Sequence, residues 1–204
     1  MRRAHFSPVR WPLPTLSVLL MSESAFIVRV PEAESHVAGL RNRFDASVHF
    51  GVPAHITVLV PFMPPERITA AIFAEIRDVF RPLPAFDFSL SRVARFPATA
   101  YLAPEPPDPF IALTEALVQR FPEFPPFRGE HSSVVPHLTV ANGNANEAEI
   151  AATELEATMR ACGAIHSRCS SVLLIENSSG CWKEMHAFAL HTAHGVGSCN
   201  PSQC

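Results

Sequence analysis

The sequence has no excess of basic residues. It contains 16 Lys and Arg against 19 Asp and Glu in 204 residues, so its formal net charge at pH 7 is −3. Proteins that coat long nucleic acids gain much of their affinity by neutralising phosphates with basic side chains. The charge therefore argues against a binder of long duplexes. If RNA is the substrate, we expect the protein to hold an end or a small fragment.

Several other signatures are also missing. No apolar run approaches the ~18 residues needed to cross a membrane. No glycine-rich phosphate loop accompanies an expected strand-to-helix junction, and no GxSxG elbow supports a serine hydrolase. The five cysteines are odd in number and form no CxxC pair, which disfavours a disulfide framework and a zinc site. We therefore expect reduced thiols, a cytoplasmic location and no cofactor.

The two ends of the chain carry little structural signal. Residues 1–22 contain a short apolar stretch interrupted by prolines, with no clear cleavage site after it. We predict a disordered leader there rather than a secretion signal, and Met21 is a possible natural start. Residues 194–204 are predicted to form a loose tail. Residues 23–193 then form a single domain, which is an ordinary size for one core.

The stretch between these ends alternates strand-like and helix-like patterns twice. Runs rich in β-branched residues, or with alternating apolar residues, predict strands, and apolar residues at helical spacing predict helices. The strands are expected over residues 25–30, 54–60, 86–90, 93–96, 99–102, 134–141, 171–176 and 185–191, and the helices over 32–44, 66–80, 110–121 and 147–162. Because the two halves resemble each other, we predict an α+β fold with two similar lobes.

A histidine motif occurs once in each half. The first copy reads Val52-Pro53-Ala54-His55-Ile56-Thr57-Val58, and the second reads Val135-Pro136-His137-Leu138-Thr139-Val140. Side chains two residues apart on a strand point to the same face. Each histidine should therefore project beside its threonine, while the aliphatic residues point into a core. One copy alone would mean little, but two matched copies rarely arise by chance.

On these motifs, the chain resembles the two-histidine phosphoesterase superfamily, and most of all its 2′-5′ RNA ligase-like members. The resemblance runs from about Ser24 to His191 and is carried by the stretches from His55 to Phe62 and from His137 to Val140, with weaker support around Tyr101 and Trp182. It implies a bilobal fold of two antiparallel-sheet-plus-helix lobes related by pseudo-two-fold symmetry, with one motif per lobe facing a central cleft. It also implies action on 2′,3′-cyclic phosphates, ADP-ribose cyclic phosphate or 2′-5′ linkages.

The residue types of the motifs suit the opening of a cyclic phosphate. That reaction needs a base to deprotonate water and an acid to protonate the departing ribose oxygen. Two imidazoles can supply both at neutral pH, and His55 and His137 are therefore the predicted acid–base pair, in either order. The hydroxyls of Thr57 and Thr139 can donate hydrogen bonds to the non-bridging oxygens, where negative charge develops. We expect the same pair to run ligation weakly in reverse.

Three further residues are candidates for substrate binding. Phe62 and Tyr101 can stack on a base or ribose, or pack in the core like most aromatic residues. Arg128, in the loop before the second motif, can bind a phosphate or remain a solvated loop arginine. Arg92 and Arg95 carry the same two interpretations, and Trp182 is either a lid or a core aromatic.

Two rival hypotheses compete with catalysis by two histidines. His49 and His131 each precede a motif histidine by six residues, which raises a metal site, but no carboxylate or cysteine joins either pair at ligand spacing. We therefore expect no metal. The other rival is a non-catalytic module of the same fold that binds RNA or nucleotide phosphates. Retention of all four motif residues favours catalysis, and we expect a monomeric enzyme acting on a small nucleotide or an RNA terminus.

Overall fold

The computed structural model describes residues 22–130 and 133–192. The predicted leader, apart from Ser22, and the predicted tail lie outside these residues, as does His131. The strands are β1 (Ser24–Arg29), β2 (His55–Leu59), β3 (Phe86–Phe96), β4 (Thr99–Glu105), β5 (Leu138–Asn142), β6 (Ile165–Cys169), β7 (Ser171–Glu176) and β8 (Lys183–Ala189). The α-helices are α1 (Glu34–Phe44), α2 (Ala70–Phe80), α3 (Asp108–Arg120) and α4 (Ala145–Cys162).

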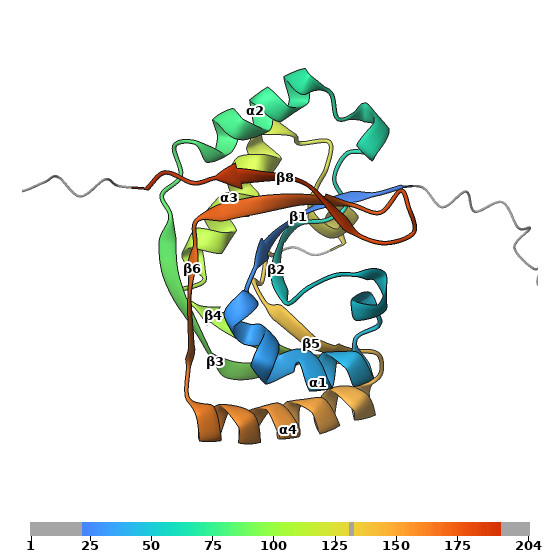
Figure 1. The fold of residues 1–204 in the computed structure, drawn as a ribbon, viewed down its shortest axis with the longest axis vertical. Coiled ribbons are helices and arrows are strands. Elements are labelled where there is room, and N and C mark those ends of the chain that lie inside the picture. Colours follow the sequence, from blue (N-terminus) through green and yellow to red (C-terminus); the bar gives the residue numbers. More distant parts are fainter. Residues whose placement is uncertain (1–21, 131–132, 193–204) are drawn as a thin grey trace, which may run out of the picture.

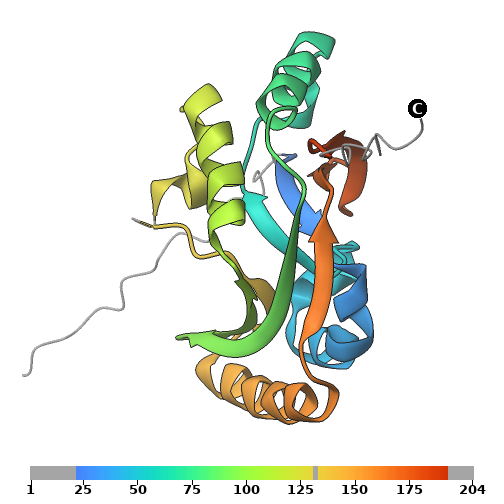
Figure 2. The ribbon, with the colours of Figure 1, turned by 90° about the vertical axis from the view of Figure 1, so that its left-hand side faces the viewer.

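The strands form two four-stranded antiparallel sheets. Their orders are β2-β1-β7-β8 and β5-β4-β3-β6, so each histidine motif adjoins an edge strand, β2 in one sheet and β5 in the other. Helices α2 and α3 pack together at one end of the molecule, against β8 and β2 respectively (Figure 1). Helices α1 and α4 pack together at the other end, beneath the second sheet (Figure 2). The predicted α+β fold with two antiparallel lobes is therefore confirmed.

One hydrophobic core joins the two sheets. It includes Phe26 and Leu59 from the first sheet and Leu90 and Leu102 from the second, all at most 1% exposed. The opposite face of the first sheet carries a smaller apolar cluster, formed by Ala25, Ile27, Leu173 and Ile175, with Val60 and Trp182 packed against it. Strand β1 is therefore buried on both faces, and its β-branched residues suit this position.

The observed strands differ from the expected ones in several places. The strands predicted at 86–90 and 93–96 are one long strand, β3, which continues past a register irregularity between Leu90 and Arg92 in its pairing with β4. Strand β6 was not predicted, although it alternates buried and more exposed residues. The strand predicted from residue 134 begins only at Leu138, because Pro136 has no N–H to donate to a ladder. His137 therefore lies immediately before β5.

Within residues 22–130 and 133–192, no helix is both long and apolar enough to span a membrane.

The shared core predicts that the two lobes unfold together. We expect one cooperative urea transition, lowered by Phe26→Ala in the first sheet and by Leu102→Ala in the second, each by ~2–5 kcal/mol, because both leave cavities in the same cluster. Val135→Ala, at an exposed side chain, is the matched control and should change little. Circular dichroism and tryptophan fluorescence should report the same midpoint. Two separate transitions would contradict a common core.

Candidate functional site

The first motif lies on β2 with the predicted alternation. Ile56 and Val58 are 0% and 3% exposed and belong to the shared core. His55 and Thr57 are half-buried and point to the other face of the strand. Across the ladder, His55 lies opposite Arg29 of β1. Directly opposed residues of an antiparallel pair share a face, so Arg29 lies beside this histidine.

The second motif repeats the pattern at β5. Leu138 and Val140 are fully buried, and His137 and Thr139 are half-buried. Thr139 lies opposite Tyr101 of β4. The two motifs therefore present the same residue types at equivalent edges of the two sheets.

Both histidine rings are oriented by the same kind of hydrogen bond. Nδ1 of His55 lies 2.8 Å from the carbonyl oxygen of Pro53, and Nδ1 of His137 lies 2.7 Å from the carbonyl oxygen of Val135. A carbonyl can only accept, so Nδ1 carries the proton in each ring. Nε2 is then the atom that gains or loses a proton when either ring takes part in chemistry.

The two motifs lie within electrostatic reach of each other. Strands β2 and β5 approach each other although they belong to different sheets. Positive charge on His137 also makes a minor contribution to lowering the pKa of His55. The structure thus brings together the two predicted acid–base residues.

Burial disfavours the charged form of both rings. It lowers the pKa of His55 to about 4, with the Pro53 carbonyl opposing the shift, the Arg41 charge adding to it and Asp45 opposing it. Burial also lowers the pKa of His137, and the Val135 carbonyl opposes that shift. At neutral pH both rings of the ligand-free protein are therefore mainly neutral, with Nε2 unprotonated.

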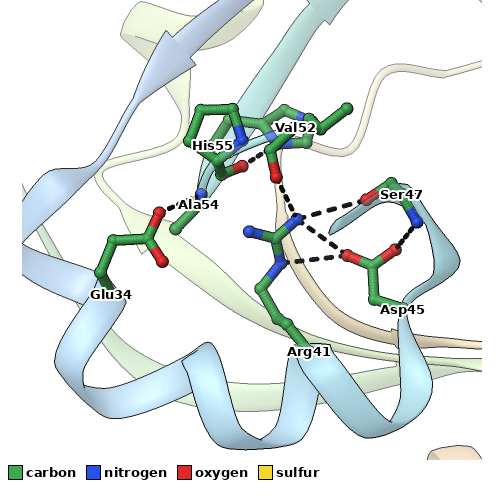
Figure 3. Close-up of polar contacts among 8 residues, drawn as sticks. Glu34, Arg41, Asp45, Ser47, Val52, Ala54 and His55 are labelled. Carbon is green, nitrogen blue, oxygen red and sulfur yellow. Dashed lines mark hydrogen bonds and ion pairs between the residues drawn. The ribbon is translucent and has the colours of Figure 1, made fainter. Parts of the chain in front are cut away.

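A buried ion pair supports the segment that leads into His55 (Figure 3). Arg41 of α1 is 2% exposed, and its Nε donates to Asp45 at 3.0 Å. Its Nη2 donates to Ser47 at 3.2 Å and to the carbonyl of Val52 at 3.1 Å. The Asp45 carboxylate also accepts from the backbone N–H of Ser47. The charged groups are thus hydrogen-bonded, as burial requires.

A second residue of α1 holds the same segment. The carboxylate of Glu34 accepts from the backbone N–H of Ala54 at 2.6 Å. Helix α1 packs against β5 and α4 of the other lobe, and Asp45, just after this helix, bridges to Asn142 at the end of β5. Helix α1 therefore connects the backbone beside His55 to the strand that carries the second motif.

Aromatic rings surround His137. The Tyr101 ring lies 5.1 Å from the imidazole and the Phe96 ring 5.3 Å, measured between centroids, and these two aromatic rings lie 4.5 Å apart. Tyr101 is 6% exposed, so little of its ring remains for stacking on a ligand. Tyr101 packs against His137 and so restrains the orientation of the imidazole.

The two other residues predicted to bind substrate, Phe62 and Arg128, make their contacts within the protein. Phe62 is 3% exposed and packs against Phe26 and Phe121, so it offers no ring face to a ligand. Its predicted role in base stacking gives way to the alternative of ordinary core packing. Arg128 is exposed and pairs with Glu23, so its cation is already engaged within the protein.

Reasoning from sequence missed Arg29 and the buried Arg41–Asp45 pair. Both have a signal in the sequence, since Arg29 is the one charged residue of an otherwise apolar strand and Arg41 falls on the apolar stripe of its helix. Within the described part of the chain, no three His, Cys, Asp or Glu side chains are grouped so that they could hold a metal ion.

The rings predict a defined NMR titration. We expect His55 to titrate near pH 4 and His137 below the ordinary value of about 6.5, because burial penalises both imidazolium forms. Nitrogen chemical shifts of the neutral rings should show the Nδ1–H tautomer. His55→Asn and His137→Asn assign the signals by removing them one at a time. A ring that titrates at 7 or above, or an Nε2–H tautomer, would contradict this geometry.

The charges behind His55 predict opposite effects from two substitutions. Arg41→Met removes a cation and leaves Asp45, so the pKa of His55 should rise, whereas Asp45→Asn should lower it further. Breaking the buried pair should also lower the free energy of unfolding, by ~3–5 kcal/mol for Arg41→Met. Both shifts are read by NMR, and His137 serves as the internal control. Shifts of the same sign in both variants would exclude this electrostatic account.

Two comparisons with known proteins identify relatives. The family model of the 2′-5′ RNA ligase superfamily matches residues 30–180. Among solved structures, TT0787 of Thermus thermophilus is 18% identical with a TM-score of 0.52, over 84% of this chain and all of that one. Escherichia coli LigT complexed with 3′-AMP is 14% identical with a TM-score of 0.56, over 83% of this chain and 98% of that one. At these identities the structures show a common fold.

The comparison with curated proteins gave no match. The family model covers about three quarters of the chain and both motifs. The chain therefore belongs to the 2′-5′ RNA ligase superfamily.

Proposed function

We propose that this protein is a metal-independent phosphodiesterase that opens 2′,3′-cyclic phosphates of small nucleotides or RNA ends, acting as a cytoplasmic monomer. One observation carries the proposal. Two histidines with matching Nδ1 hydrogen bonds stand at equivalent sheet edges, on strands that approach each other although they belong to different sheets. This arrangement supplies two equivalent Nε2 atoms for one phosphate.

The reaction proceeds by proton transfer at both sides of the phosphorus. Nε2 of one neutral ring takes a proton from water as the water oxygen attacks. Nε2 of the other, protonated ring gives its proton to the ribose oxygen whose bond to phosphorus breaks. Thr57 and Thr139 lie beside their histidines and donate to the non-bridging oxygens. The same steps with a ribose 5′-hydroxyl in place of water form a 2′-5′ linkage as the bond from phosphorus to the 3′-oxygen breaks, which is the ligase reaction.

The acid of the pair must gain a proton when substrate binds, because burial lowers the pKa of both rings. The negative charge of a bound phosphate stabilises an imidazolium next to it, so substrate binding raises the pKa of the ring that acts as the acid.

The solved relatives are consistent with a small nucleotide substrate. Structures of E. coli LigT include complexes with 3′-AMP, with NADP+ and with ATP. Ligands of this size also agree with the absence of a basic excess in this chain.

Removing either motif histidine should abolish most turnover. We expect adenosine 2′,3′-cyclic phosphate to be opened in the presence of EDTA, and His55→Ala and His137→Ala each to lower kcat by ~10²–10⁴-fold. His166→Ala, at an exposed position on β6, is the matched control. Thr57→Val and Thr139→Val should have milder effects. Product formation is followed by chromatography.

Three results that differ from this expectation would each lead to a different conclusion. Nucleotide binding without turnover would favour the alternative of a non-catalytic phosphate-binding module. Turnover that appears only after a divalent metal is added would contradict the two-histidine mechanism. Unchanged activity in Thr57→Val and Thr139→Val would make the threonines structural.

A further inference from the structure

A small hollow adjoins the first motif on the face of the sheet that carries His55. It has a volume of about 230 Å³ and shares Pro53, whose carbonyl orients His55, with the motif itself. Its floor is formed by Ile27 of β1 and by Leu173 and Ile175 of β7, which belong to the smaller apolar cluster. Pockets for whole drug-sized ligands usually measure ~300–1,000 Å³, so this one suits a single ring.

Trp182 lines the hollow and packs against its apolar cluster, and its backbone is anchored to the segment just before the first motif. Its backbone N–H donates to the carbonyl of Phe50 at 2.7 Å. The adjacent Gly51 has a φ of 84°, and a Cβ there would lie 3.3 Å from the carbonyl oxygen of Trp182. The close approach therefore depends on glycine. An indole fixed above an apolar floor is a suitable surface for an aromatic base to stack on.

The rim of the hollow carries two cationic side chains, Arg29 and Lys183. Arg29 lies directly opposite His55 and is the one exposed residue of β1, and Lys183 begins β8. Over the described ranges, neither side chain forms an ion pair, although Glu184 shares the rim. Most other arginines of the described residues, such as Arg41 and Arg128, are engaged by carboxylates. An unengaged guanidinium beside a phosphate-handling histidine is suited to bind a second anionic group.

We propose that this hollow is a subsite which selects nucleotides carrying a second phosphate, with the base against Trp182 and the second phosphate on Arg29. The proposal rests on the proposed function for the placement of the reacting phosphate between the two histidines. The substrate class is then a cyclic-phosphate nucleotide that also bears a 5′-phosphate, rather than a simple cyclic mononucleotide.

The test compares adenosine 2′,3′-cyclic phosphate with the same compound carrying a 5′-phosphate. Binding is measured in a His55→Ala/His137→Ala background, which separates recognition from turnover. Trp11→Phe leaves Trp182 as the only tryptophan, so quenching of its fluorescence reports a ligand in the hollow. Turnover of both compounds is measured in parallel in the protein with both histidines.

We expect the 5′-phosphate to tighten binding ~10–100-fold and Arg29→Gln to remove most of that gain while leaving the simple cyclic nucleotide little changed. Arg29→Lys should restore part of it. Arg77→Gln removes the same charge from an exposed position on α2 and controls for net charge. Trp182→Phe should weaken both ligands modestly, and Trp182→Ala should weaken both further.

The outcomes separate this proposal from the proposed function. Turnover of both compounds with equal efficiency, unaffected by Arg29→Gln, would overturn the subsite and leave the phosphodiesterase intact. Binding that depends on Arg29 and on the 5′-phosphate, without turnover by the intact pair, would support the subsite and reject the catalytic proposal. Tight binding without quenching of Trp182 would also overturn the placement of the base.

Discussion

The alternation of side chains along two edge strands is the constraint on which the site depends. Ile56 and Val58 of β2, like Leu138 and Val140 of β5, are committed to one shared core. Because successive side chains of a strand point to opposite faces, this commitment forces the histidine and threonine of each motif to the other face. A shift of either strand by one residue would bury the polar residues and expose the aliphatic ones. The burial that stabilises the fold therefore also determines which face of each strand carries the histidine and the threonine.

The two halves of the site are alike in their rings and different in their surroundings. Each imidazole is oriented by a backbone carbonyl two residues earlier in the chain. Behind the first ring lies the Arg41–Asp45 pair, and beside the second lie the rings of Phe96 and Tyr101. Nearby charges therefore modify the pKa of His55, which burial lowers most, whereas aromatic packing restrains the ring of His137. Helix α1 links these environments, since it anchors the first motif and packs against the strand of the second.

Local patterns in the sequence were sufficient to predict most of the elements, though not β6, and the two motifs, because both follow from the period of a strand or helix. They could not predict which strands pair, since β1 pairs with β7 from far along the chain. Phe62 was misassigned because it lies beyond the end of β2, where alternation no longer determines the side. The Arg41–Asp45 pair has the spacing of an ordinary surface ion pair on a helix, and only the packed structure shows that it is buried. The position of Arg29 beside His55 likewise follows only from the pairing of β1 with β2, which local patterns do not predict.

The central claim is that two rings from different sheets flank one ligand, and a titration tests it most directly. Adding 3′-AMP to the isotope-labelled protein should move the Nε2 signals of His55 and His137 together, along curves that give the same Kd. Replacing either histidine should weaken the response of the other, since one phosphate contacts both. Movement of only one ring, or two curves with different Kd values, would show that the motifs do not form a common site.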